Sequence, residues 1–389
     1  MTLIACLVLL FWLIVALDLK RWWPASHTLK KSEERGAERG GGESGVLVVI
    51  PARNEASSLP TTLPSLLVQN EDFSQLVLVD DGSSDGTRAV ADTIVSASGD
   101  SRKSLIAAAP SPPPGWSGKI HALQCGLRAG CDTARGRAGG FEWFLFTDAD
   151  IQHPSGSIRA LLDKADDGGY DLVSVMARLR IDGFWERLLV APFVYFFQFL
   201  YPFRRVADAR SRVAAAAGGC VLVRSCLLEN IGGLEVIRDA VIDDVALAAR
   251  VKQAGGRCWL GLDPEIRSLR GYGTLGEMTH MVARTAFNQL GYRYSLLGGT
   301  LLFLGIFFVS PPAIALLGAL NGCAIAGAAA LLAWAIQAAT FFPAVRHQRV
   351  RPLYALTLPI ASVLYGYMTC VSAWRHLKRG GVEWKGRKV

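Results

Sequence analysis

The chain has 389 residues, of which 51% are hydrophobic and only 19% are charged, and its formal net charge at neutral pH is +8. This composition is too apolar for an ordinary soluble enzyme, and it favours a membrane protein that also carries a folded domain. Much of the positive charge lies beside apolar segments, where basic residues attract anionic lipid head groups, so the charge does not indicate nucleic-acid binding.

An apolar run from Leu3 to Leu17 opens the chain. It has no basic n-region and no clear small-residue cleavage site, which favours a retained membrane anchor over residues 1–21; a cleaved signal peptide stays open as the alternative. Lys20 and Arg21 follow directly, and by the positive-inside rule they keep the next segment in the cytoplasm. Residues 22–45 end in a Gly-rich stretch and are predicted to be a flexible linker.

From residue 46 onward, short apolar runs alternate with segments of helical character, which is the pattern of an α/β domain. We predict that this domain occupies residues 46–290. The predicted strands are Val46–Ile50, Leu76–Val79, Phe144–Phe146, Leu172–Val175, Val221–Val223 and Cys258–Leu260, and the predicted helices include Ser57–Gln69, Lys119–Gly130 and Asp243–Gln253. Asp85 is a candidate N-cap for a further helix after the second strand.

Two groups of aspartates follow predicted strands. Asp80 and Asp81 follow the second strand, and Asp148 and Asp150 follow Phe144–Phe146. Open α/β sheets bind ligands at the carboxyl ends of their strands, so both groups are expected near one binding site. An Asp-x-Asp pair can hold Mg²⁺ or Mn²⁺ through one or two carboxylates while a substrate diphosphate supplies further oxygens. This chemistry is typical of a nucleotide-sugar transferase.

One segment inside the predicted domain is unusually aromatic. Residues 188–203 are short for a membrane span and are flanked by Arg187, Arg204 and Arg205. Tyr and Trp favour the head-group layer, so we predict an interfacial helix there, with a buried core helix as the alternative.

The C-terminal third is the most apolar part of the chain. Ser295–Val345 and Leu353–Ala373 contain no Lys, Arg, Asp or Glu, and a bilayer span takes about 20 apolar residues. We therefore predict two or three transmembrane helices over residues 291–375, followed by a basic tail over 376–389. The number of spans and the side of the C-terminus stay open, because Pro311, Pro312 and Pro359 are places where a helix can break.

Three motifs in order resemble family 2 glycosyltransferases with the GT-A fold. They are Val48–Glu55 (VVIPARNE), Asp80–Thr87 (DDGSSDGT) and Thr147–Asp150 (TDAD). Further stretches resemble the hopene-associated glycosyltransferases, so that the likeness runs from about residue 46 to 388; these stretches include Pro112–Lys119, Phe196–Phe203, Ala214–Cys220, Ile242–Asp244 and Trp384–Arg387. The resemblance implies a mixed sheet with flanking helices.

The resemblance also implies a set of donor-binding residues. In such a fold the loop after the first strand lines the nucleotide pocket, the Asp-Asp pair reads a uracil edge, and a lysine at a helix start offsets phosphate charge. The corresponding residues here are Pro51, Ala52, Asn54, Glu55, Asp80, Asp81, Lys119, Asp148 and Arg284. Two alternative interpretations remain: Asp81 could belong to an ordinary turn, and Lys119 could be a solvated surface lysine.

The remaining site residues follow from the same likeness. Asp148 and Asp150 would be the metal ligands, with Mg²⁺ or Mn²⁺ as the cofactor. Asp244 would be the general base that takes the proton of the acceptor hydroxyl, whereas Asp243 can be explained as a charge that stabilises a helix N-terminus. Gly218 and Gly219 would let the backbone approach the acceptor or donor sugar closely, or else form only a turn.

We therefore expect an inverting, metal-dependent glycosyltransferase of the inner (cytoplasmic) membrane, multi-pass, with its catalytic domain facing the cytoplasm. Its expected partners are a nucleoside-diphosphate sugar, UDP-linked in our prediction, a membrane lipid acceptor and the bilayer, with no nucleic acid. The resemblance favours a hopanoid acceptor; ceramide, diacylglycerol and polyprenyl phosphate are alternatives. A non-catalytic membrane scaffold in hopanoid assembly is the alternative from another class.

Processive polysaccharide synthases carry Gln-x-x-Arg-Trp after the base, whereas this chain has Val282–Gln289 (VARTAFNQ) in that region. The difference favours the addition of a single sugar. The sequence leaves the sugar, the choice between Mg²⁺ and Mn²⁺, and the oligomeric state open.

Overall fold

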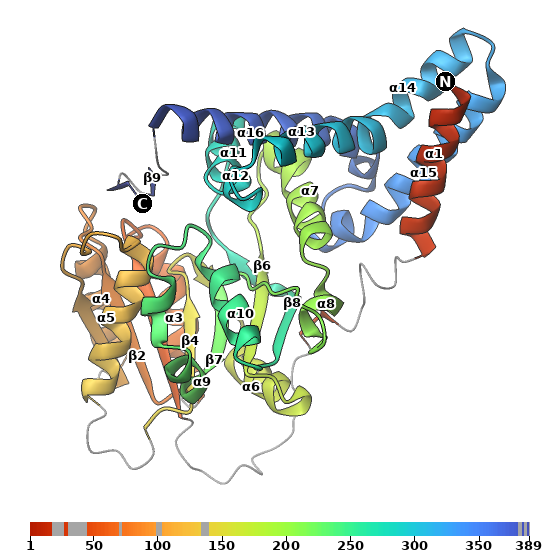
Figure 1. Ribbon diagram of the computed structural model, residues 1–389. Coiled ribbons are helices and arrows are strands. Elements are labelled where there is room, and N and C mark those ends of the chain that lie inside the picture. Colours follow the sequence, from red (N-terminus) through yellow and green to blue (C-terminus); the bar gives the residue numbers. More distant parts are fainter. Residues whose placement is uncertain are drawn as a thin grey trace. The chain divides into compact units, whose positions relative to one another are not determined.

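The computed structural model describes residues 1–17, 27–29, 45–69, 72–98, 103–133, 140–379, 383–384 and 387–388 (Figure 1). The chain divides into two compact units. The sheet unit comprises Ser26–Leu179, Phe203–Arg270 and Trp384–Val389, and the helical unit comprises Met1–Ala25, Arg180–Pro202 and Gly271–Glu383. Most of the predicted linker 22–45, and part of the predicted tail 376–389, lie outside the described residues.

The sheet unit is built on an eight-stranded sheet with the order β3-β2-β1-β4-β7-β6-β8-β5. Its strands are β1 (Val46–Ala52), β2 (Gln75–Asp80), β3 (Ser104–Ala108), β4 (Trp143–Thr147), β5 (Ile151–Gln152), β6 (Leu172–Arg178), β7 (Cys220–Arg224) and β8 (Cys258–Ser268). The pairs among β1, β2, β3 and β4 are parallel, whereas β7 runs antiparallel to both β4 and β6. The sheet is therefore mixed, and all six predicted strands are present.

The mixed topology brings several chain segments to one edge of the sheet. Because β1, β2 and β4 are parallel, the residues that follow them lie at the same edge. Cys220, at the start of antiparallel β7, pairs with Thr147 at the end of β4. Gly218 and Gly219, which precede β7, therefore lie beside Asp148, which follows β4.

Helices flank this sheet in the sheet unit (Figure 1). They are α3 (Leu59–Leu67), α4 (Thr87–Ala97), α5 (Gly118–Thr133), α6 (Ser157–Gly168), α8 (Phe203–Ala207), α9 (Ser225–Asn230), η3 (Gly233–Ile237) and α10 (Asp243–Gln253). Helix α5 packs closely on β1, because a Cβ at Gly126 would stand 2.4 Å from Val49 Cγ1. This close packing fixes the position of the α5 N-terminus, which carries Lys119.

One local prediction needs correction. The N-cap of α4 is Gly86, with φ 85, and not Asp85. A cap residue in the left-handed region suits glycine, and the Asp85 carboxylate instead accepts hydrogen bonds from the backbone N–H groups of Thr87 and Ala56. Thr28, in the predicted linker, forms a β-bridge with Leu262 of β8.

The helical unit contains the three helices of the described chain that are long and apolar enough to cross a membrane: Tyr294–Leu320, Ala324–His347 and Pro352–Lys378. Its elements are α1 (Thr2–Leu17), α7 (Phe184–Leu200), α11 (Leu275–Ala283), α12 (Ala286–Gln289), α13 (Tyr294–Phe303), the π-helical η4 (Leu304–Val309), α14 (Ser310–Leu320), α15 (Ala324–His347), η5 (Pro352–Thr357) and α16 (Leu358–Arg379). The N-terminal helix α1 is apolar but shorter, with 16 residues.

The aromatic segment predicted at 188–203 forms α7, which belongs to the helical unit. Tyr195 hydroxyl and Thr340 Oγ1 of α15 lie 2.9 Å apart, and Tyr365 of α16 donates to the Leu189 carbonyl over 2.8 Å. Helix α7 thus packs against α15 and α16 within the helical unit. Residues 180–202 and 271–290 of the predicted domain 46–290 fall in the helical unit.

The two short strands β9 (Glu383–Trp384) and β10 (Arg387–Lys388) pair with each other.

Candidate active site

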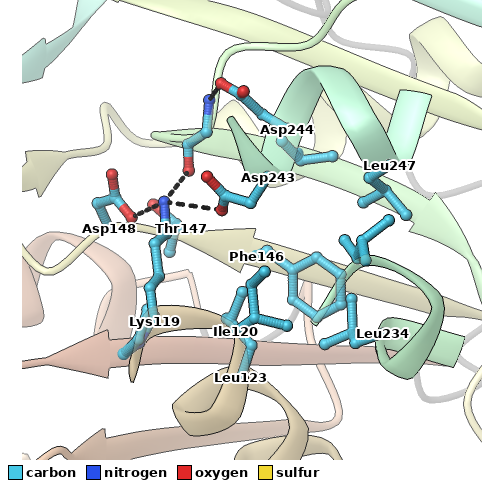
Figure 2. A pocket seen from close by; sticks show the side chains of 14 residues that line it. Lys119, Ile120, Leu123, Phe146, Thr147, Asp148, Leu234, Asp243, Asp244 and Leu247 are labelled. Atoms are coloured by element: carbon cyan, nitrogen blue, oxygen red, sulfur yellow. Dashed lines mark hydrogen bonds and ion pairs between the residues drawn. The ribbon is translucent and has the colours of Figure 1, made fainter. Parts of the chain in front are cut away.

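A pocket lies at the edge of the sheet where β1 and β4 end (Figure 2). Three of its walls come from α5, from the residues before β7 and from the start of α10. Its lining residues are Pro51, Lys119, Ile120, Leu123, Phe146, Thr147, Asp148, Gly218, Val221, Leu234, Ile237, Asp243, Asp244 and Leu247. One side is apolar, and the opposite side gathers three carboxylates around one ammonium group.

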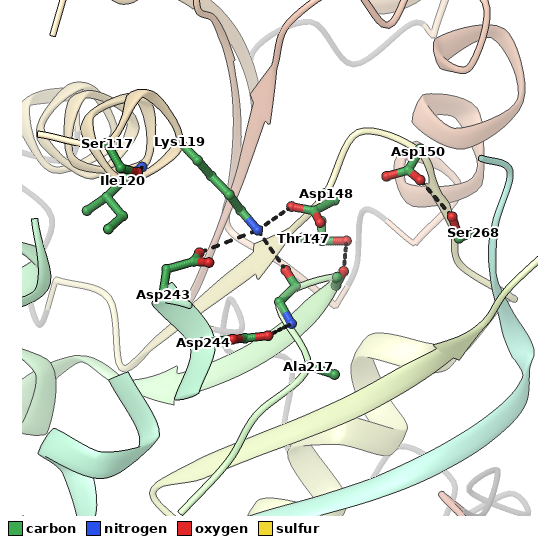
Figure 3. Close-up of polar contacts among 12 residues, drawn as sticks. Ser117, Lys119, Ile120, Thr147, Asp148, Asp150, Ala217, Asp243, Asp244 and Ser268 are labelled. Carbon is green, nitrogen blue, oxygen red and sulfur yellow. Dashed lines mark hydrogen bonds and ion pairs between the residues drawn. The ribbon is translucent and has the colours of Figure 1, made fainter. Parts of the chain in front are cut away.

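Lys119 is the centre of the polar side (Figure 3). Its Nζ lies 2.8 Å from Asp148 Oδ1 and 3.5 Å from Asp243 Oδ2. It also donates to the Gly218 carbonyl over 3.4 Å. One ammonium group thus ties together the start of α5, the residue after β4, the start of α10 and the loop before β7. Lys119 is therefore not a solvated surface lysine, the alternative interpretation of the sequence.

The charges of this cluster perturb one another. Burial by itself would lower the pKa of Lys119, but the carboxylates of Asp148 and Asp243 outweigh it and hold the pKa above its usual range. Burial raises the pKa of Asp148, and the neighbouring ammonium of Lys119 only partly offsets that rise. Lys119 is therefore a permanent cation at neutral pH.

The carboxylate of Asp244 is held by two backbone N–H groups. Its Oδ2 accepts a hydrogen bond of 2.6 Å from the Gly218 N–H, and its Oδ1 accepts one of 2.8 Å from the Val245 N–H. Burial, and next the charge of Asp243, raise the pKa of Asp244 to about 6, against the opposing effects of Lys119 and the two hydrogen bonds. A side chain at Gly218 would intrude here, since its Cβ would stand 3.2 Å from Asp244 Oδ2.

Asp150 lies apart from this cluster, as Figure 3 shows. Its Oδ2 accepts a hydrogen bond of 2.7 Å from Ser268 Oγ, at the end of β8. The side chain of Asp150 is thus directed by a residue 118 positions further along the chain.

The loops after β1 and β2 are joined by side-chain hydrogen bonds. Asn54, with φ 53, accepts from the Ser84 N–H over 2.9 Å, and its own N–H donates to Ser83 Oγ over 2.9 Å. The Asp80 carboxylate accepts from the Ser83 N–H over 3.1 Å. The conformation of both predicted donor loops is therefore fixed without a ligand.

Two ion pairs strengthen this region. Glu55 Oε1 lies 2.9 Å from Arg270 Nη2, and the buried carboxylate of Asp81 lies 3.5 Å from Arg53 Nη1. Asp81 is more than an ordinary turn residue, because its side chain is only 2% exposed and is ion-paired.

The predicted site residues fall into three groups. Pro51, Lys119, Asp148, Gly218 and Asp244 line the pocket. Ala52, Asn54, Glu55, Asp80, Asp81, Asp150 and Gly219 belong to the sheet unit but do not line it. Arg284 belongs to the helical unit, at the C-terminal end of α11.

Sequence reasoning assigns no site role to Asp243 and overlooks Ser268. From the sequence, Asp243 is explained only as a negative charge that stabilises the N-terminus of a helix. In the structure this residue also lines the pocket and pairs with Lys119. Nothing in the local sequence around Ser268 indicates its contact with Asp150.

The described residues contain no group of three or more His, Cys, Asp or Glu side chains that could hold a metal ion on their own. Asp148 and Asp150 nevertheless offer hard carboxylate oxygens, which suit Mg²⁺ or Mn²⁺. Asp150 Oδ1 makes no hydrogen bond to any residue that the structure describes. The pair therefore fits a cation that takes its remaining ligands from a bound diphosphate and water.

Comparison with known proteins agrees with this architecture. Residues 47–232 match the profile of Glycosyl transferase family 2. Undecaprenyl-phosphate 4-deoxy-4-formamido-L-arabinose transferases from Aeromonas hydrophila and Salmonella choleraesuis are each 29% identical over 145 residues, which is 36% of this chain. The matched region spans only about 40% of the length of those relatives.

The solved structure of a mannosyltransferase from Pyrobaculum calidifontis, in complex with GDP-Man and Mn²⁺, is similar over 96% of this chain and 98% of its own, with a TM-score of 0.53 and 18% identity. Its similarity establishes the fold, a GT-A sheet with flanking helices. The profile match covers residues 47–232, and over that part the chain is similar to family 2 glycosyltransferases.

Proposed function

We propose that this protein is an inverting glycosyltransferase in which Asp244 is the general base. The observation that carries the proposal is the Asp244 carboxylate itself, which lines the pocket, is held by the Gly218 N–H and has a pKa raised to about 6. A base is most effective when its pKa lies near the working pH. The acceptor oxygen attacks the anomeric carbon, the bond from that carbon to the diphosphate breaks, and the hydroxyl proton passes to Asp244.

The donor in this proposal is a nucleoside-diphosphate sugar, UDP-linked in our preferred version. The fixed loops after β1 and β2 would hold the nucleoside, with Asp80 and Asp81 at the base. Lys119, which donates from the N-terminal turn of α5, would offset phosphate charge. The Pyrobaculum mannosyltransferase binds GDP-Man with Mn²⁺, which supports a nucleotide sugar here and leaves the identity of the base to be tested. Arg284 is a further candidate for the diphosphate.

Asp148 and Asp150 would hold the divalent cation, Mg²⁺ or Mn²⁺. When bound, the cation supplies Lewis-acid stabilisation of the departing diphosphate. The role of the protein is to orient both carboxylates at the end of β4, and Gly218 and Gly219 would let the backbone approach the sugar.

The acceptor in this proposal is a membrane lipid with a hydroxyl group, with a hopanoid as our first candidate. Three helices able to cross a membrane support a lipid acceptor and a site in the cytoplasmic membrane. A hydroxyl nucleophile must lose its proton during the attack, and Asp244 would accept that proton as the general base. Ceramide and diacylglycerol share this chemistry.

Polyprenyl phosphate is the second candidate, because both curated relatives are named as undecaprenyl-phosphate transferases. Its phosphate oxygen is already deprotonated at neutral pH and needs no base. The role of Asp244 therefore separates the two candidates.

The experiment uses purified full-length protein with UDP- and GDP-sugars and the two acceptor classes, and mass spectrometry of the lipid products. Asp244→Asn should lower transfer to a hydroxyl acceptor by about 10²–10⁴-fold while sparing UDP binding. The matched control is Asp92→Asn, an exposed aspartate of α4 that pairs with Arg88. Full activity of Asp244→Asn on a hydroxyl lipid would remove Asp244 as the base. Product from polyprenyl phosphate alone would reject the hopanoid assignment, and no product from any pairing would favour the scaffold.

A further inference from the structure

We propose that Ser268 is a positioning residue for the cation site: it fixes the orientation of the Asp150 carboxylate and leaves one oxygen for a divalent ion. The inference rests on the proposed function, because it takes Asp150 to be a cation ligand. It adds a residue at the end of β8, 118 positions after Asp150 in the chain, which none of the sequence motifs contains.

The first support is the direction of the hydrogen bonds at Ser268. Its Oγ accepts from the Arg270 N–H over 3.2 Å, and it lies 2.7 Å from Asp150 Oδ2. A hydroxyl has a single proton, and the carboxylate can only accept, so that proton points at Asp150 Oδ2. A distance of 2.7 Å is in the range of charge-assisted O–H···O⁻ bonds.

The second support is the burial of the pair. Ser268 is 6% exposed and Asp150 is 9% exposed, so water competes little for this bond. Because Oδ2 is engaged, Oδ1 is the oxygen that remains for a cation. Outer partners of this kind orient metal-binding carboxylates and commonly set the metal affinity.

The third support is that the backbone around Ser268 is itself fixed. The Leu269 N–H donates to the Asp150 carbonyl over 2.8 Å, and Ile151 of β5 pairs with Ser268 of β8. The side chain of the next residue, Arg270, reaches Glu55 in the loop after β1. One short segment at the end of β8 therefore holds both the candidate cation ligand and a candidate donor loop.

The test measures Mn²⁺ binding to the purified full-length protein in the presence of UDP, by the electron paramagnetic resonance signal of free Mn²⁺. Ser268→Ala should weaken Mn²⁺ binding by about 10- to 100-fold. Ser268→Thr keeps the hydroxyl and should recover most of the lost affinity. The matched control is Ser104→Ala at the start of β3, where Oγ has no partner among the described residues.

Turnover provides a second readout. In Ser268→Ala the Mn²⁺ concentration for half-maximal activity should rise, and saturating Mn²⁺ should restore kcat. Ser268→Cys tests the same bond if the Ala variant does not fold, because a thiol keeps the volume but is a weak donor.

The outcomes are distinct. Wild-type Mn²⁺ affinity in the Ala or Cys variant would overturn the role of Ser268 and leave the proposed function standing. A wild-type protein that binds no Mn²⁺ with UDP would overturn the cation assignment and this inference together. Equal loss in the Ala and Thr variants would show that packing, and not the hydroxyl, sets the affinity.

Discussion

The ammonium group of Lys119 lies 2.8 Å from Asp148 Oδ1, so the first acid of the Asp-x-Asp pair is already paired with a cation of the protein itself. Asp150, the second acid, has no such partner among the residues that the structure describes and is held by a hydroxyl group instead. The two carboxylates therefore have different tasks in the free protein. A diphosphate that enters the pocket would meet Lys119 as well as the cation, so the ammonium group is placed to move from carboxylate to phosphate.

Replacement of Lys119 tests this arrangement. Lys119→Met removes the positive charge that faces Asp148, Asp243 and Asp244, and we expect weaker donor binding and lower turnover. Because Lys119 lowers the pKa of Asp244, its loss should also move the acid limb of the kcat/KM profile to higher pH. Lys119→Arg keeps the positive charge, so the acid limb of its kcat/KM profile should lie at the same pH as in the wild type. If the acid limb of Lys119→Met lies at the wild-type pH, Lys119 does not lower the pKa of Asp244.

The proposed role of Asp244 as the general base predicts the pH dependence of the wild-type enzyme. A general base must be ionised, and the pKa of Asp244 is raised to about 6, so kcat/KM should rise with pH up to about 6 and level off above it. Asp243 faces Asp244 and raises its pKa, so Asp243→Asn should shift the limb to lower pH. A profile that is flat between pH 5 and 7, about one unit on each side of 6, would contradict the assignment.

The same shift has a consequence for stability. Between the ordinary value of 3.8 and about 6, the folded protein keeps a proton on Asp244 that the unfolded chain has released. The free energy of unfolding contributed by this group therefore falls as the pH rises through that window, and it stays constant above it. Asp244→Asn should remove this part of the pH dependence of the thermal midpoint.

Removal of the cation should stop the reaction. We expect that chelation by EDTA abolishes transfer and that added Mg²⁺ or Mn²⁺ restores it. Asp150→Ala should resist this rescue, because the oxygen that Ser268 leaves open is gone. Activity of Asp150→Ala at ordinary Mg²⁺ concentrations would contradict the role of Asp150.

Local patterns predicted much of this fold, and long-range contacts account for what they missed. Asp243–Gln253 is predicted and observed with identical bounds, because an acidic start and a polar-to-basic end are encoded within the helix itself. The Lys119–Asp243 and Asp150–Ser268 contacts join residues more than 100 positions apart, and no local pattern encodes them. Helix α7 likewise belongs to the helical unit because of the residues that pack against its apolar sides. Its composition does not specify which residues these are.

The helical unit contains a comparable long-range contact at a break in one candidate span. In regular α-helix or π-helix the carbonyl of Phe307 would accept from residue 311 or 312, but both are prolines and have no N–H. Trp12 Nε1 of α1 donates to this carbonyl over 2.8 Å, and Gln337 Nε2 of α15 donates to the Phe308 carbonyl over 3.2 Å. Side chains from two other helices thus satisfy the backbone groups that the prolines leave unpaired.

Trp12→Phe should therefore destabilise the helical unit even though it keeps an aromatic ring at a fully buried position. The Phe307 carbonyl would lose its donor, at a cost of about 1–3 kcal/mol for an unsatisfied buried group. Pro311→Ala returns a backbone N–H to the helix, so the penalty of Trp12→Phe should shrink in the Trp12→Phe/Pro311→Ala double variant. Thermal unfolding of the four proteins in detergent measures this coupling directly. Additive effects would show that the Trp12 hydrogen bond does not replace the one that Pro311 removes, and that α1 is held by packing alone.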